Sequence, residues 1–179
     1  VQALAAAGYH TAQTGKTHLY THSNWPRGRH MRDFAHVLEG YGFRETHETA
    51  GKEASLHVDS LYTDYLAEHG LLKGYRDYVR TRSKAMRETV PGVEISAAWR
   101  TEPLPLPLHA HPDVWLGAYT ADWIRRYDRD EPFFLQVGFA GPHDPWDAPL
   151  EALEAFGDPE LPMPGSLAPP QIPDSGPLA

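Results

Sequence analysis

Short apolar or alternating runs separate stretches of helical spacing along this chain. Residues 1–8 predict the end of a helix, because alanine and leucine favour helices and Gly8 suits a C-terminal cap. Residues 9–14 alternate between two sides and predict a short strand that ends at Gly15. Residues 132–139 are nearly all apolar or aromatic, which is typical of a strand buried on both faces of a parallel sheet.

Helical spacing recurs between these two strands. Residues 60–70 predict a helix that Ser60 can cap, and residues 74–90 predict a second helix or partly ordered stretch with more charge. A further helix is predicted to begin near Pro112, because proline suits the first helical turn, and to end near residue 129. Its predicted apolar stripe is Val114, Ala118, Ala121 and Ile124, with Trp115 and Leu116 beside it.

The remaining segments are rich in turn residues or proline. We expect a surface loop at 20–30, a weak strand at 41–45 and a short helix at 150–156. Residues 91–110 predict a proline-rich connector or an insertion over a cleft, because alternating prolines exclude a helix interior and a central strand. Residues 157–179 contain seven prolines and predict a tail without regular structure.

The alternation of strands and helices indicates an α/β protein with one core, which 179 residues can supply. The formal net charge of −8 argues against a nucleic-acid partner but permits a small anionic ligand in a cleft that contains a few cations. No cysteine is present, and no apolar run approaches the roughly 18 residues of a membrane span. Because the chain starts at Val1 without a methionine and ends in a loop-like tail, we expect an internal piece of a longer protein. No signal peptide is visible, and for such a piece this leaves the compartment open.

Ionisable residues follow both predicted strands. Lys16 and His18 come just after the first strand, and His143 lies in a turn between two prolines after the second. If both strands belong to one parallel sheet, these side chains reach the same edge, where ligands of open α/β sheets bind. A lysine cation and two imidazoles suit a tetrahedral oxyanion, because fixed cations stabilise charge that develops on its oxygens and a histidine can protonate a leaving oxygen.

Simpler interpretations exist for each of these residues. Gly15-Lys16-Thr17 is a poor phosphate-binding loop, because that motif needs glycine where His10 stands, and Lys16 could be an ordinary surface lysine. His143 could cap a turn, and Trp146 could form a substrate-facing wall or pack in a core. Histidine spacing gives weak metal pairs at His18 with His22 and at His109 with His111, loop positions make Asp144 and Asp147 mostly solvated carboxylates, and Arg125 and Arg126 suit a solvated helix end.

At these motifs the chain resembles the sulfatase family. Residues 7–19, which end in Gly-Lys-Thr-His-Leu, are similar to the sulfatase segment built around G-K-x-H-L. Residues 132–149 are similar to its second segment, a strand followed by P-H-x-P. The helix beginning near His111, residues 62–70 and the tail at 157–164 also resemble family spacing, so the resemblance covers most of the chain in order.

The resemblance implies part of an alkaline phosphatase-like catalytic domain at residues 1–156, a sheet flanked by helices that is incomplete here, with residues 157–179 crossing to a C-terminal part. It implies hydrolysis of a small-molecule sulfate monoester by a formylglycine nucleophile with a divalent cation, usually calcium. Lys16 would bind the sulfate and the oxygens on the metal side, and His18 would contact the formylglycine hydroxyl and assist its deprotonation or the breakdown of the hemiacetal. His143 would bind the ester and protonate the leaving oxygen. Trp146 would line the substrate site.

The departures from the family are also clear. No C/S-x-P-x-R segment, which supplies formylglycine, occurs in this chain, and the family's metal-binding aspartates are absent, so we expect neither cofactor to be bound by this piece alone. Thr17 stands where the family commonly has tryptophan. Two further functions therefore stay open: a phosphonate or phosphate ester hydrolase of the same superfamily, and a non-catalytic anion-binding module. The sequence does not distinguish between the bacterial cytoplasm and the periplasm as the compartment of the protein.

Overall fold

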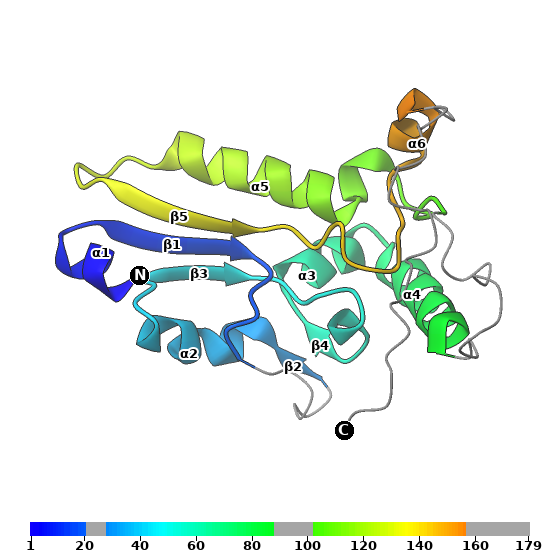
Figure 1. Cartoon of the computed structure of the whole chain (residues 1–179), viewed down its shortest axis with the longest axis horizontal. Coiled ribbons are helices and arrows are strands. Elements are labelled where there is room, and N and C mark those ends of the chain that lie inside the picture. The colour runs from blue at the N-terminus through cyan, green and yellow to red at the C-terminus, as the bar shows by residue number, and fades with distance from the viewer. Residues whose placement is uncertain (21–27, 88–101, 157–179) are drawn as a thin grey trace, which may run out of the picture.

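A three-stranded parallel sheet forms the centre of the computed structural model, which describes residues 1–20, 28–87 and 102–156 (Figure 1). Its strands are β1 (His10–Gly15), β3 (Glu45–Glu48) and β5 (Phe133–Gly138), in the order β3-β1-β5. The central strand β1 pairs Ala12 with Glu45 on one side and with Leu135 on the other. Since all three strands run in one direction, their carboxyl ends meet at one edge of the sheet.

One long helix covers a face of this sheet. Helix α5 (Pro112–Arg126) runs along the strands in Figure 1. Its Thr120 hydroxyl lies 3.0 Å from that of Thr14 in β1, and its Trp123 Nε1 donates to Glu45 in β3 over 2.7 Å. The buried side of α5 therefore pairs with polar groups of the sheet as well as packing on it.

The other elements surround the sheet and extend beyond its carboxyl edge, where α3 and α4 lie in Figure 1. They are α1 (Gln2–Ala6), β2 (Arg29–His30), a 3₁₀ turn at Met31–Phe34, α2 (Ala35–Gly40), a 3₁₀ turn at Ala54–Leu56, β4 (Val58–Asp59), α3 (Leu61–Glu68), α4 (Leu72–Arg87), a 3₁₀ turn at Leu108–Ala110 and α6 (Leu150–Phe156). β2 and β4 form a separate two-stranded parallel sheet.

The main apolar core lies where α3, α4 and α5 meet. It contains Tyr62, Leu66, Tyr75, Val79, Leu104, Ala110, Trp115 and Leu116. Leu104 comes from the proline-rich stretch, so the described part of the predicted 91–110 connector packs into this core. Residues 91–101 of that prediction and the predicted tail at 157–179 lie outside the described residues.

Much of the predicted α/β pattern is confirmed. The strands predicted at 9–14 and 132–139 are β1 and β5, and the predicted helices at 60–70 and 150–156 are α3 and α6. The helix predicted at 74–90 is α4 as far as residue 87, and residues 88–90 lie outside the described residues. Ser60 caps α3, because its hydroxyl accepts the Thr63 N–H while its own N–H donates to the Thr63 hydroxyl over 2.6 Å. The turn residues 21–27 of the predicted loop lie outside the described residues, and the end of that loop forms β2 instead.

The strand predicted at 41–45 was wrong in position. Tyr41 is the C-terminal cap of helix α2, a helix that the sequence did not indicate, and the strand runs over Glu45–Glu48. This strand has no apolar alternation because its inward side chains are paired rather than apolar: Glu45 accepts from Trp123, and His47 Nδ1 lies 2.9 Å from the Tyr119 hydroxyl.

The predicted apolar stripe of α5 was also wrong. Val114 and Ile124 are 37% and 47% exposed, whereas the buried residues of the helix are Pro112, Trp115, Leu116, Thr120 and Trp123. The apolar pattern gave the wrong face of α5 because the helix uses aromatic and polar side chains to contact a partly polar face of the sheet.

Strand β5 is less buried than its composition predicts. Phe133 is exposed and the other residues of the strand are only half-buried, because β5 is the outer strand of the described sheet. Among the described residues no helix is both long and apolar enough to cross a membrane.

Candidate anion-binding site at the carboxyl edge of the sheet

Three segments leave the sheet together at its carboxyl edge. Lys16 follows β1, and its N–H donates to the Gly138 carbonyl over 2.7 Å; Thr49 follows β3, and its N–H donates to the Gly15 carbonyl over 3.0 Å. A side chain at Gly138 would place Cβ 1.9 Å from the Lys16 carbonyl oxygen. Glycine at position 138 is therefore required for β5 to approach Lys16 this closely.

The side chain of Lys16 is partly buried at this edge. Its Nζ would lie 3.3 Å from a Cβ placed on Gly51, so it runs directly over the segment that follows β3. Burial lowers the pKa of Lys16 below its ordinary value; the Asp144 carboxylate opposes this shift, and the Lys52 ammonium adds to it. The charges of Lys52 and Asp144 are therefore close enough to Lys16 to affect its pKa.

His143 lies in the turn after β5 with its side chain 55% exposed. Its Nδ1 lies 2.8 Å from the Asp144 carbonyl oxygen and 3.0 Å from Asp144 Oδ1. Because a carbonyl oxygen can only accept, Nδ1 bears the hydrogen of this bond. The peptide bonds Gly141–Pro142 and Asp144–Pro145 on either side are cis.

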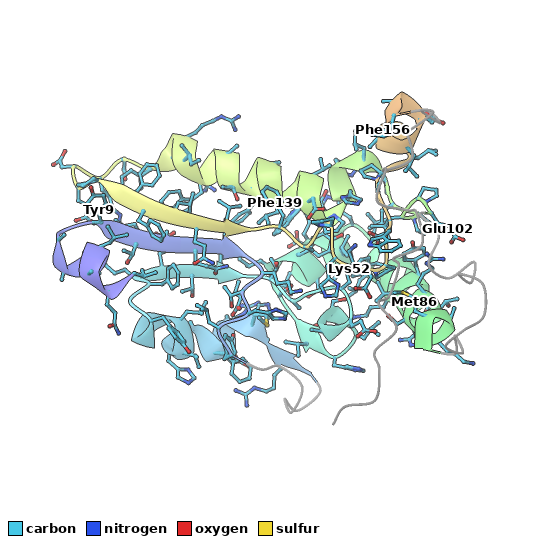
Figure 2. The ribbon with its side chains drawn as sticks, in the orientation of Figure 1. Tyr9, Lys52, Met86, Glu102, Phe139 and Phe156 are labelled. Atoms are coloured by element: carbon cyan, nitrogen blue, oxygen red, sulfur yellow. The ribbon has the colours of Figure 1, made fainter. Side chains whose placement is uncertain are left out.

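Charged side chains from two other elements hold the backbone of this turn. Asp113, in the first turn of α5, accepts the N–H groups of Ala140 and Gly141 over 3.0 and 3.1 Å. Lys52, which Figure 2 labels near the carboxyl edge of the sheet, donates to the carbonyls of His143 and Pro145 over 3.0 and 2.8 Å.

Asp147 completes this arrangement and is not a solvated loop carboxylate, as was expected. Its side chain is only 3% exposed and accepts a hydrogen bond from the buried Lys52 ammonium. Burial raises the pKa of Asp147, and Lys52 opposes that shift. The expectation was wrong because the cation that Asp147 pairs with is 95 residues away in sequence.

His111 also serves this region rather than a metal pair with His109. Its Nε2 lies 3.0 Å from the Asp147 carbonyl oxygen, and its Nδ1 accepts the Asp113 N–H over 3.3 Å at the start of α5. Both ring nitrogens are thus used within the chain, while His109 is exposed.

His18 is exposed, but the segment that bears it is anchored. The preceding Thr17 is buried, and its hydroxyl donates to Glu48 Oε1, while the Tyr20 hydroxyl donates to Glu48 Oε2. Burial raises the pKa of Glu48, and the bonds from Thr17 and Tyr20 oppose that shift. The buried Glu48 carboxylate at the end of β3 is therefore bonded to residues before and after His18 in the chain.

Lys16 and the segment bearing His143 lie at the same edge of the sheet. The joint contact of Lys16, His18 and His143 with one anion stays a prediction, as does a substrate contact by Trp146, whose side chain is 46% exposed and whose carbonyl accepts the Glu102 N–H over 3.0 Å.

Sequence reasoning missed Lys52 and Glu48. Placing the third strand at Glu45–Glu48 would have put Lys52 on the same edge of the sheet, four residues past the strand end. Among the described residues, no group of three or more histidines and carboxylates is arranged to hold a metal ion. His22, proposed as a weak metal partner of His18, lies outside the described residues.

The structure thus defines an α/β protein in which loops bearing Lys16, Lys52 and His143 meet at the carboxyl ends of parallel strands. The chain is 28% identical over 162 residues to an arylsulfatase of Clostridium perfringens (strain 13 / Type A), a match that covers 90% of this chain and 30% of the relative. This similarity supports a sulfatase-related family. The chain spans about 30% of the length of that relative. No family model matches the chain, and no solved structure matches it.

Proposed function

We propose that the full-length protein containing this chain is a sulfatase that hydrolyses a small-molecule sulfate monoester to an alcohol and sulfate. The observation that supports this most directly is that Lys16 and the anchored His143 turn lie at the same edge of the sheet, in a chain 28% identical to an arylsulfatase. The function of the whole protein stands as a proposal because the chain spans only part of that relative.

Lys16 is proposed to bind the sulfate oxygens. Its ammonium is partly removed from water and supplies a positive charge at this edge, whereas the nearby Lys52 ammonium is already paired with Asp147. Preorganised cations of this kind stabilise charge that develops on oxygen during ester cleavage, because they need no reorganisation as the reaction proceeds.

His143 is proposed to bind the ester and to protonate the leaving oxygen. Since Nδ1 donates to the Asp144 carbonyl, Nε2 remains for the substrate, and it bears a proton only when the ring is an imidazolium. The Asp144 carboxylate oxygen Oδ1 lies 3.0 Å from the same Nδ1, so both neighbouring acceptors are on the Nδ1 side of the ring.

His18 and Trp146 have more limited support. His18 is proposed to act at the nucleophile, because its anchored segment follows Lys16 at the same edge. Trp146 is proposed to line the substrate site, because it follows the His143 turn and is an exposed aromatic residue.

The proposal includes a divalent cation, calcium, and a formylglycine in the full-length protein. These groups do not fit the residues described here: the chain has no C/S-x-P-x-R segment, and its described part holds no group of three histidines or carboxylates arranged for a metal. When bound, they would supply the nucleophile and its activation, and the residues of this chain would bind and orient the ester.

The test is an assay of the intact protein on 4-nitrophenyl sulfate, 4-nitrophenyl phosphate and a phenylphosphonate ester, with the Lys16→Ala variant alongside. A preference for the sulfate that Lys16→Ala reduces would support the proposal. A preference for the phosphate or phosphonate would favour the sister hydrolase instead. Sulfate binding without turnover of any ester would favour a non-catalytic anion-binding module.

A further inference from the structure

Lys52 and Asp147 form an ion pair that is almost completely removed from water. Their side chains are 5% and 3% exposed, and the Lys52 ammonium donates to Asp147 Oδ1. Two further bonds run from Lys52 Nζ to the carbonyls of His143 and Pro145, over 3.0 and 2.8 Å. An ammonium has three hydrogens, so its donors are fully used, and every acceptor belongs to residues 143–147.

This pair connects two segments that leave different strands. Lys52 lies in the segment after β3, and its acceptors lie in the segment after β5, 91 to 95 residues later. Asp113 holds the other end of the same turn through the N–H groups of Ala140 and Gly141. The backbone of His143 is thus fixed between an anion on one side and a cation on the other.

Stability alone is a poor explanation for such a pair. Desolvation of two charges costs several kcal/mol per ion, and well-packed apolar residues of similar volume are often at least as stabilising. In addition, Asp147 Oδ2 is buried with no hydrogen-bond partner among the described residues, so the pair is not fully satisfied. What this pair supplies, and apolar residues would not, is a directed hold on the carbonyl of His143.

We infer that Lys52, held by Asp147, is a positioning residue that sets the place of the His143 ring for protonation of the leaving oxygen. The inference rests on the proposed function for its catalytic consequence. The ring depends on this hold because its own Nδ1 bonds to the Asp144 carbonyl, which lies between the two carbonyls that Lys52 binds.

The kinetic test uses the intact protein and aryl sulfates whose leaving groups differ in acidity. Lys52→Met keeps much of the side-chain volume but removes the charge and the donors, and Asp147→Asn removes the charge of its partner. Lys73→Met is the matched control, because Lys73 also pairs with an aspartate, Asp77, but has a side chain 90% exposed. A misplacement of about 1 Å can cost about 10²-fold in rate.

We therefore expect Lys52→Met to lower kcat by about 10²-fold for the poorest leaving group and by less than about tenfold for the best, with little change in KM. Asp147→Asn should give a smaller loss of the same pattern, and Lys73→Met no loss. An equal loss across the series would overturn the inference, because a merely structural defect or a general loss of anion attraction does not depend on the leaving group.

A second measurement does not depend on activity. The imidazole ¹H–¹⁵N resonances of His143, assigned with His143→Gln, should shift in Lys52→Met and Asp147→Asn but not in Lys73→Met. Unchanged resonances in folded variants would overturn the inference. Should wild type cleave no sulfate ester while these resonances shift, the proposed function fails and the positioning stands. If Lys52→Met does not fold, the same kinetic series and the same His143 resonances are measured on Asp147→Asn, and they test the inference in its place.

Discussion

The Nδ1 atom of His143 lies 2.8 Å from the carbonyl oxygen of Asp144, and this contact determines which ring nitrogen is available to a substrate. The bond uses the Nδ1 hydrogen, so the neutral ring offers Nε2 only as an acceptor. A general acid at this position must therefore be the imidazolium. If the ring is neutral, Nε2 can instead accept a proton and act as a general base.

Replacing His143 should affect substrates unequally. His143→Ala in the intact protein is expected to lower kcat by about 10²–10⁴-fold for aryl sulfates with poor leaving groups, because these need a proton in the transition state. Substrates with good leaving groups should lose far less. His36→Ala, at an exposed histidine of α2, is the matched control and should leave the series unchanged. Equal losses for all leaving groups would remove the general-acid assignment.

Lys16→Ala tests the cation at the sheet edge. We expect kcat/KM to fall by about 10²–10³-fold, or about 3 kcal/mol, because one preorganised donor to a developing oxyanion is lost. Lys73→Ala should have no such effect, since Lys73 is 90% exposed on α4. Steady-state kinetics on one aryl sulfate measures both variants. A kcat/KM for Lys16→Ala equal to that of Lys73→Ala would contradict the proposed role.

The same lysine predicts the alkaline limb of the pH profile. Burial lowers the pKa of Lys16 below 10.5, and the charge on Asp144 only partly opposes this. The cation is lost as pH rises, so kcat/KM, which reports the free enzyme, should decline at a lower pH than an ordinary lysine would give. Lys16→Arg should move this decline to higher pH, because arginine stays charged. If the alkaline decline of kcat/KM occurs at the same pH in Lys16→Arg as in wild type, it is caused by another group.

The sequence predicted the elements that have a strong periodicity or a residue type typical of the start or end of a helix or strand. Gly15 ends β1, Ser60 caps α3 and Pro112 opens α5, because each residue has a local backbone role that no tertiary contact needs to supply. Lys16 and His143 could be placed on one edge for the same reason, since each follows a recognisable strand.

The rest depended on contacts between distant residues. Strand β3 is polar, and its Glu45 and His47 are matched by aromatic side chains of α5 more than 70 residues away, so no apolar pattern indicated it. Without that strand, Lys52 could not be assigned to the edge of the sheet. Asp147 looked solvated because the charge that pairs with it comes from that unrecognised segment.

Thr17→Val tests the anchor of the His18 segment. The two side chains have similar shape, but valine leaves the buried Glu48 carboxylate without the Thr17 donor. We expect a loss of about 1–3 kcal/mol in the free energy of unfolding, the cost of a buried acceptor that loses its partner. Urea titration measures it, and Thr81→Val, at an exposed position of α4, is the control. A loss no larger than that of Thr81→Val would show that Glu48 does not need this bond.

Glu45 predicts how the stability of the sheet responds to acid. Burial raises its pKa, but hydrogen bonds from His47, Trp123 and His10 outweigh burial and lower the pKa to about 2, from 4.5 in an unfolded chain. A carboxylate with a lowered pKa stabilises the folded state above its unfolded pKa and loses that contribution as pH falls toward the folded value. The window for this loss is therefore between about pH 4.5 and about pH 2.

Glu45→Gln should accordingly be less stable than wild type at neutral pH, by about 1–3 kcal/mol, because His10, His47 and Trp123 lose a charged acceptor. The difference should shrink between pH 4.5 and pH 2, where the wild-type carboxylate also becomes neutral. Urea unfolding at a series of pH values measures both variants, with the exposed Glu39→Gln of α2 as control. A difference that does not change with pH would mean that Glu45 contributes by packing rather than by its charge.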